Sequence, residues 1–286
     1  MKKKLIVTGC SWVDPITLSE DPRVSHEIVR GYKKWPNILA EMLDMTIINY
    51  GKAAAGNEYI FSSIVDNITK MNEDERKNIG LVVIAWSQAK RTDFEYRKNE
   101  DDHYVKGVFE KIGNKYEPNY VWDSVLYTDP LRGDMYYKVR QSIRYIYTLQ
   151  TFLKYHNIPY KMVQSIPITK ITTLDTDFNP GITFGSSQRS KYSPREIENK
   201  MEKILLEDLR DFPMYEQIDK SNFIGYPILN YSLYQKLDPK KDFISDLTKT
   251  DPKFRNDDHP NQSGHDKIAN TIFSYVRKRD YKKDDK

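Results

Sequence analysis

The sequence predicts an α/β fold built on a parallel sheet, because strand-like apolar runs alternate with amphipathic helical patterns. Lys4–Thr8, Thr46–Asn49 and Leu81–Trp86 are short runs of strand length. Between them, apolar residues recur at helical spacing over Trp35–Leu43 and Ile60–Ile68. A β-α-β-α-β order favours parallel strands joined by crossover helices. Leu81–Trp86 is apolar throughout, as expected for a central strand covered on both faces.

The remainder of the chain continues this pattern after an interruption. It predicts a helix over Val139–Leu153, a fourth strand at Tyr160–Val163, a helix over Ile197–Leu209, a last strand near Phe223–Ile228, and a final helix containing Ile268–Val276. Together these elements predict a three-layer α/β/α sandwich with a mostly parallel, flavodoxin-like five-stranded sheet.

A single domain over residues 1–286 is the simplest organisation, because no repeat or linker-like composition shift divides the chain. Residues 88–130 break the alternation with a charged, tyrosine-rich and weakly periodic stretch. We interpret it as an insertion over one end of the sheet. The charged residues at about 279–286 are predicted to form a solvated tail.

Composition and charge argue against several classes of protein. The sequence lacks the ~20-residue apolar run that a membrane span needs. The apolar stretch after the N-terminal lysines is too short for a signal peptide, which favours a soluble, cytoplasmic protein. Cys10 is the only cysteine, so no internal disulfide is expected. A net charge of +4 with interspersed signs does not indicate nucleic-acid binding.

Ser11 is the first residue with catalytic potential. The segment Gly9-Cys10-Ser11-Trp12 directly follows the first predicted strand. Ligands of open parallel sheets bind at the carboxyl ends of the strands. A serine presented there can act as a nucleophile if a base reaches it. Taken alone, however, a serine in such a turn is more often a helix cap.

His259 is the second such residue, in the segment Asp257-Asp258-His259-Pro260 before the last predicted helix. A carboxylate beside a histidine can fix its tautomer and stabilise the imidazolium, which produces a general base. Without a partner, the same segment is better explained as a surface histidine in an acidic loop.

Taken together, these segments resemble the SGNH (GDSL-like) hydrolases. GCSW at 9–12, IINYGKAAAGNEYI at 47–60 and DDHPNQSGH at 257–265 follow the order of that family's blocks. The resemblance implies Ser11 as nucleophile, His259 as base and Asp257 as the carboxylate that orients it. The more usual family spacing would place the acid at Asn256, and Asp258 is the remaining alternative.

The same resemblance implies an oxyanion hole with three donors. The Ser11 N–H would be the first and the Gly56 N–H the second, with Gly51 as the alternative glycine. The family's third donor is an asparagine after the third strand, which this chain lacks. Ser87 or Gln88 at that position is expected to replace it.

Other side chains near these segments are candidates for contacts with the substrate. They are Trp12, Asn57, Trp86 and Arg91, although Asn57 is equally explained as a helix cap and Arg91 as a surface residue. The remaining histidines show no spacing typical of metal ligands, so no metal is expected. GKAAAG at 51–56 is not a phosphate loop, because its lysine precedes the small residues and no Gly-Lys-Ser/Thr follows them. No cofactor is therefore predicted.

These observations predict an esterase or O-deacetylase that cleaves a small-molecule or carbohydrate ester. The missing asparagine and Asn256 leave open a catalytically impaired binding or structural module. An acyltransferase that uses the same residues is a third alternative. The tyrosine content is also compatible with a homo-oligomer.

Overall fold

The core of the protein is a five-stranded sheet in which every pairing is parallel. The computed structural model describes residues 2–15, 32–97, 120–126, 135–168, 203–225, 231–238, 241–243 and 259–277. The strand order is β2-β1-β3-β6-β7. The strands are β1 Lys4–Gly9, β2 Thr46–Asn49, β3 Ile79–Trp86, β6 Tyr160–Gln164 and β7 Phe223–Ile224.

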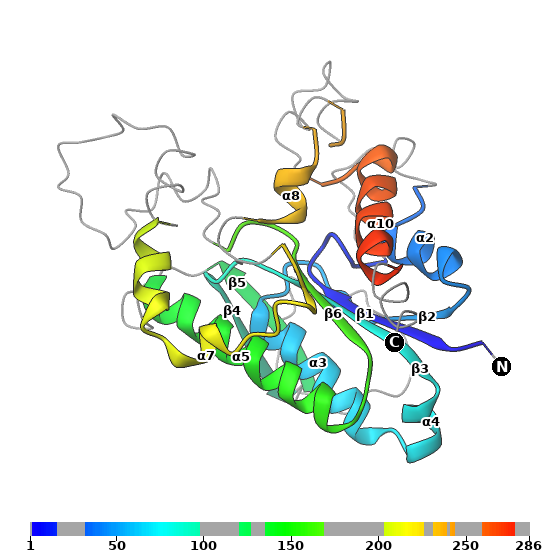
Figure 1. Cartoon of the computed structure of the whole chain (residues 1–286), viewed down its shortest axis with the longest axis horizontal. Coiled ribbons are helices and arrows are strands. Elements are labelled where there is room, and N and C mark those ends of the chain that lie inside the picture. The colour runs from blue at the N-terminus through cyan, green and yellow to red at the C-terminus, as the bar shows by residue number, and fades with distance from the viewer. Residues whose placement is uncertain are drawn as a thin grey trace, which may run out of the picture.

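Helices cover both faces of this sheet (Figure 1). α3 Asn57–Lys70 and α5 Met135–Tyr155 pack on one face, and α2 Trp35–Met42 and α10 Gln262–Arg277 pack on the other. The predicted three-layer α/β/α sandwich is therefore confirmed. Its strand order is the flavodoxin-like one, in which the chain starts in the middle of the sheet and reverses direction beside β1.

Alternating side chains of the central strands build two separate apolar cores. Ile6, Val82 and Ile84 point towards α3 and α5, whereas Val7 and Val83 point towards α2 and α10. All five side chains are fully buried. Burial on both faces explains why β1 and β3 appear in the sequence as continuous apolar runs without polar alternation.

Several elements differ from the prediction at their ends or were not foreseen. α3 begins at Asn57, before the predicted start at Ile60. A short helix, α4 Glu73–Lys77, has no buried residue and is held by a capping box between Asn72 and Glu75. The remaining helical segments are residues 203–210, α7 Pro213–Glu216 and α8 Leu233–Lys236.

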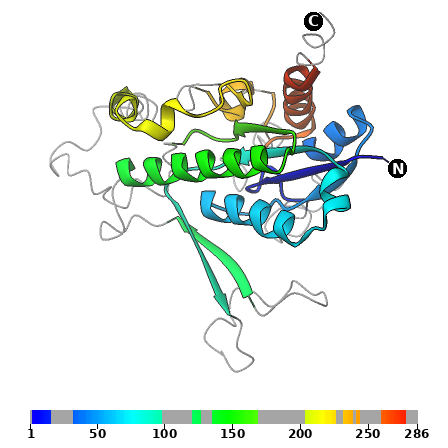
Figure 2. The same cartoon turned by 60° about the horizontal axis from the view of Figure 1, so that its bottom comes forward.

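The insertion contains an antiparallel two-stranded ribbon, β4 Arg91–Arg97 and β5 Tyr120–Leu126. Figure 2 shows the ribbon extending away from the layered body. Arg91 pairs with Leu126 at its root. Residues 98–119 of the insertion lie outside the described residues, as does the predicted tail at 279–286. Within the described ranges, no helix has the length and apolar character needed to cross a membrane.

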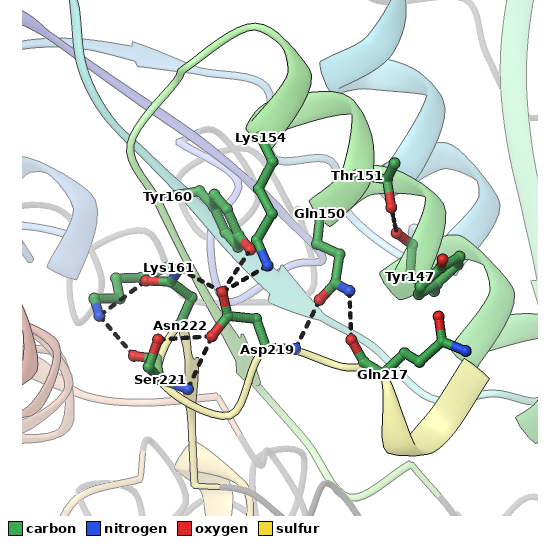
Figure 3. Close-up of polar contacts among 10 residues, drawn as sticks. All are labelled: Tyr147, Gln150, Thr151, Lys154, Tyr160, Lys161, Gln217, Asp219, Ser221 and Asn222. Atoms are coloured by element: carbon green, nitrogen blue, oxygen red, sulfur yellow. Dashed lines mark hydrogen bonds and ion pairs between the residues drawn. The ribbon is translucent and has the colours of Figure 1, made fainter. Parts of the chain in front are cut away.

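A polar network around Asp219 lies at the amino ends of the strands, here called the amino edge of the sheet (Figure 3). Lys154 at the end of α5 forms an ion pair with Asp219 Oδ2 at 2.8 Å. Asp219 Oδ1 accepts hydrogen bonds from the Ser221 hydroxyl at 2.6 Å and from its N–H at 3.1 Å, and Asn222 Nδ2 donates to Oδ2 at 3.1 Å. The network joins the end of α5 to the start of β7, and its polar groups satisfy one another.

Candidate active site

Ser11 lies in a tight turn at the carboxyl end of β1. The N–H groups of Val13 and Asp14 both donate to the Cys10 carbonyl, at 2.8 and 3.1 Å. A Cβ on Gly9 would lie 2.3 Å from Val13 Cγ2, so only glycine permits this packing. The sequence motif therefore has a steric basis: Gly9 lets the chain fold back and present Ser11 at the edge of the sheet.

The turn is also fixed from the β2 side. Asn49 Nδ2 donates to the Val13 carbonyl at 2.7 Å, and the Ala53 N–H donates to Asp14 Oδ2 at 2.6 Å. A Cβ on Gly51 would lie 2.8 Å from the Asp14 N atom. The loop after β2 thus packs directly against the turn that carries Ser11.

His259 reaches this turn from the opposite end of the chain. Its Nε2 lies 2.9 Å from Ser11 Oγ, although the two residues are 248 positions apart. Ser11 is 8% exposed. A nucleophile and a base within hydrogen-bond reach are the first requirement of nucleophilic catalysis. With the ring proton on Nδ1, Nε2 can accept the proton of the serine hydroxyl.

A three-residue segment, 241–243, holds the loop of His259 in place. Phe243 forms an antiparallel bridge with Pro260. Asn261 Nδ2 donates to the carbonyls of Lys241 and Phe243 at 2.7 and 3.1 Å. Asp242 is fully buried, and its carboxylate accepts hydrogen bonds from Ser263 at 2.8 Å and Lys267 at 2.5 Å.

Sequence reasoning did not identify Asp242 or Asn261. The hydrogen bonds that join their two segments span 18 to 25 residues of the chain. Their local contacts are the Asp238 N–H, which donates to Asp242 Oδ2 at 2.6 Å, and the N-cap pattern of Asn261, which accepts the Gly264 N–H at 3.1 Å.

We predict that Asp242→Asn lowers kcat more than it raises KM, because the charge that anchors α10 beside His259 is lost. Burial raises the pKa of Asp242, but hydrogen bonds from Lys267, the Asp238 N–H and Ser263 outweigh burial, so the carboxyl is ionised near neutral pH. The expected loss in kcat is about tenfold, as for a small misplacement of a base. Ester hydrolysis measures it.

Asp266→Asn is the matched control, because this exposed carboxylate on α10 accepts from Gln262 within its own helix. If both variants kept full kcat, Asp242 would have no part in positioning His259.

The predicted orienting acid cannot be placed beside the histidine. Asp257 and its alternatives Asp258 and Asn256 lie outside the described residues.

The predicted glycine of the oxyanion hole requires a correction. The Gly56 N–H donates to Asp93 Oδ1 at 2.7 Å, and the Tyr59 N–H donates to Asp93 Oδ2 at 2.8 Å. The root of the ribbon therefore supplies a carboxylate that caps α3, where the helix dipole favours a negative charge. The Gly56 N–H is not open to a substrate in this arrangement. The Gly51 N–H is also engaged, by Asn49 Oδ1 at 2.8 Å.

We predict that Asp93→Ala lowers the free energy of unfolding by about 1–2 kcal/mol, because α3 loses its cap. Urea unfolding measures this change. Glu73→Ala, on the exposed helix α4, is the control, since its ion pair with Lys77 is exposed to solvent and its loss should change the stability much less. Equal stability of Asp93→Ala and the unmodified protein would contradict the capping role.

The segment after β3 carries the predicted replacements for the family asparagine. The Ser87 N–H donates to Asn57 Oδ1 at 2.8 Å, and the Ser87 carbonyl accepts from Gln164 Nε2 at 2.6 Å. The backbone of Ser87 is therefore fully engaged. Ser87 Oγ and Gln88 Oε1 are buried and have no hydrogen-bond partner in the described parts of the chain. Their side chains remain candidates for binding a ligand oxygen or hydroxyl.

The four predicted substrate contacts have different environments. Asn57 is buried and also donates to Ser142 Oγ at 2.9 Å, so it connects α3, β3 and α5. Trp86 is fully buried in the core under α3 and α5, which removes it from any open surface. Trp12 packs against Tyr234 and Phe243, with ring centroids 6.0 and 6.3 Å away.

Arg91 donates to the Ala55 carbonyl at 3.0 Å and so supports the loop before α3. It also lines a small cleft together with Glu58, Lys138 and Tyr145. Burial raises the pKa of Glu58, and hydrogen bonding to Tyr145 partly offsets this effect.

His265 is a buried neighbour of His259 on the first turn of α10. Burial lowers its pKa to about 3, and the charges of Lys34 and His259 act in the same direction. His265 is therefore neutral near physiological pH. Cys10 is a free, fully buried thiol, as expected for a residue pointing away from the turn. The described ranges contain no cluster of His, Cys, Asp and Glu that could hold a metal ion.

Fold and site together define a three-layer α/β protein with a serine–histidine pair at the carboxyl edge of its sheet. The chain belongs to a family described as "Family of unknown function (DUF6071)", whose model matches residues 15–177. The match begins after Ser11 and ends before His259. A comparison with curated proteins found no match.

Proposed function

We propose that the protein is a serine hydrolase of the SGNH type that cleaves a carboxylic ester, as an esterase or O-deacetylase. The observation that carries the proposal is the 2.9 Å separation of Ser11 Oγ and His259 Nε2. Two further observations support it: the pair lies at the carboxyl edge of a parallel sheet, and tight packing around Gly9 fixes the turn of Ser11.

The chemistry follows from the two atoms that meet. His259 Nε2 takes the proton from Ser11 Oγ as Oγ bonds to the ester carbonyl carbon. The protonated imidazole then gives this proton to the leaving alcohol, which leaves an acyl group on Ser11. Water attacks the acyl carbon as His259 removes its proton. The imidazolium then returns this proton to Ser11 Oγ as the bond between Oγ and the acyl carbon breaks and the free acid leaves.

The negative oxygen of the intermediate needs hydrogen-bond donors. The Ser11 N–H is the first donor of the proposal. The Ser87 hydroxyl is the second, because it follows β3 and its Oγ has no other partner in the described residues. One such donor contributes about 3–4 kcal/mol in other hydrolases. Ser87 thus keeps the part that was expected of it in place of the family asparagine, while the Gly56 N–H is engaged by Asp93.

One observation favours an alternative function. The Asp93 carboxylate accepts the hydrogen bond of the Gly56 N–H, which is the donor that the resemblance assigns to the oxyanion. A catalytically impaired module that binds esters without cleaving them would have this arrangement.

A fluorophosphonate probe separates the two functions, because it reacts covalently only with an activated serine. We expect labelling at Ser11, located by mass spectrometry, together with hydrolysis of p-nitrophenyl acetate. Both should disappear in Ser11→Ala and persist in Ser274→Ala, an exposed serine of α10 that bonds within its own helix. Folded protein that is neither labelled nor active would favour the binding module.

A further inference from the structure

Four buried side chains at the ends of β3 and β6 carry polar atoms without partners. The atoms are Ser87 Oγ, Gln88 Oε1, Gln164 Oε1 and Ser165 Oγ, and none has a hydrogen-bond partner within the described residues. The four residues, here called the β3–β6 polar cluster, are at most 2% exposed. Buried polar atoms are nearly always hydrogen-bonded, and leaving them unpaired reduces stability.

The cluster lies level with the nucleophile. In the parallel register, Gly9 pairs with Ala85, and Ala85 pairs with Val163. Two residues further along the three strands are Ser11, Ser87 and Ser165. The Ser165 N–H donates to the Trp86 carbonyl at 2.8 Å, which continues the ladder towards this level. The cluster is therefore at the carboxyl edge, at the end of β3, which is the neighbour of β1, and at the end of β6, which lies one strand further away.

The two edges of the sheet differ in a way that points to ligand binding. At the amino edge, the carboxylate of Asp219 and the amide of Gln150 are both satisfied by neighbouring groups. Because all of these groups bond to one another, the network needs no ligand and has a purely structural role. The atoms of the β3–β6 polar cluster have no such explanation, because their partners are not supplied by the described fold.

The chemistry of the cluster selects the kind of group that would fill it. Gln164 Nε2 donates to the carbonyls of Ser87 and Ile166, at 2.6 and 2.8 Å, so its amide orientation is fixed and Oε1 can only accept. Serine hydroxyls can donate and accept. The cluster therefore needs a ligand with several O–H or N–H donors. The Ser87 hydroxyl would donate to the oxyanion of any ester, so an alkyl chain would leave the other three atoms unpaired.

We propose that Gln88, Gln164 and Ser165 of the β3–β6 polar cluster bind the hydroxyl groups of the ester substrate, which makes that substrate an O-acylated sugar or polyol and not a lipid ester. This inference rests on the proposed hydrolase function, since it assigns the substrate of the Ser11 site. Sites built to hydrogen-bond a hydroxyl reject analogues that lack it, because their own polar groups stay unpaired.

Binding to Ser11→Ala tests the proposal without turnover. The probes are methyl 6-O-acetyl-α-D-glucopyranoside and butyl acetate, which share the acetyl ester and differ in the ring hydroxyls. We expect the acetylated sugar to bind with a Kd at least about tenfold lower in titration calorimetry. Equal affinities, or tighter binding of butyl acetate, would overturn the proposal.

Ser165→Ala in the same background assigns the selectivity to the cluster. It should remove most of the tenfold preference for the sugar while leaving the melting temperature unchanged or higher, because a buried orphan hydroxyl is lost. Ser274→Ala is the matched control on an exposed helix surface. A lower melting temperature with an unchanged preference would identify ordered water only and would overturn the assignment.

Failure of the hydrolase and failure of this inference give different results. If the acetylated sugar binds selectively but the protein is not labelled by fluorophosphonate and hydrolyses neither ester, the hydrolase proposal fails and the ligand class stands. If the protein hydrolyses both esters with similar kcat/KM, and Ser165→Ala does not change their ratio, the hydrolase stands and the cluster assignment fails.

Discussion

His259→Ala is expected to lower kcat for p-nitrophenyl acetate by about 10⁴, the magnitude seen when one member of a serine–histidine unit is removed. The reason is the 2.9 Å contact between Nε2 and Ser11 Oγ: without a base, the serine keeps its proton and is a weak nucleophile. KM should change much less. Steady-state kinetics on folded variant, verified by circular dichroism, measures the loss.

His156→Gln is the matched control, because this histidine lies after α5 and packs on Phe152, away from the carboxyl edge. It should keep the kcat of the unmodified protein. If His259→Ala retained more than about a tenth of the activity, the ring would not be the base.

The resemblance of the chain's motifs to those of the SGNH hydrolases predicted the pairing of Ser11 and His259, although they are 248 residues apart. The topology of the sheet is consistent with this pairing. A residue after the first strand of a parallel sheet must lie at its carboxyl edge, and a loop before a helix packed on that sheet can reach the same edge. Short motifs were informative because the element order fixed where each one would lie.

The hydrogen-bonding around the pair was not predictable in the same way. Asp93 lies 37 residues from Gly56 and reaches it only because β4 folds over the start of α3. The alternation of Thr92, Phe94 and Tyr96 was a signal for this strand that charged neighbours obscured. Local patterns identify strands and caps, but they do not specify which distant carboxylate will satisfy a helix end.

Asp219→Asn should lower the free energy of unfolding by about 2–3 kcal/mol near neutral pH, the range for hydrogen bonds to a charged group. Its carboxylate accepts three hydrogen bonds from Ser221 and Asn222 and pairs with Lys154. An asparagine amide has only one accepting oxygen, so its NH2 group would face one of the donors that now bond to the second carboxylate oxygen. Half of the Lys154 side chain is exposed, so the ion pair contributes the smaller part.

The same carboxylate predicts how this stability depends on pH. Burial opposes ionisation of Asp219, but hydrogen bonds from Lys154, Ser221 and Asn222 outweigh it, and the folded-state pKa lies far below the usual value. The unfolded-state pKa is about 3.9. The stabilisation is therefore fully present above that value and is lost as pH falls through the lower folded-state pKa.

Urea unfolding of the unmodified protein and Asp219→Asn, near neutral pH and near pH 2, measures this dependence. The stability difference should be largest near neutral pH and shrink in acid, since the unfolded carboxyl binds a proton that the folded one resists. Asp66→Asn, an exposed carboxyl of α3, is the control and should change stability by less than about 0.5 kcal/mol. A difference for Asp219→Asn that stayed constant with pH would mean that shape, and not charge, holds the amino edge of the sheet together.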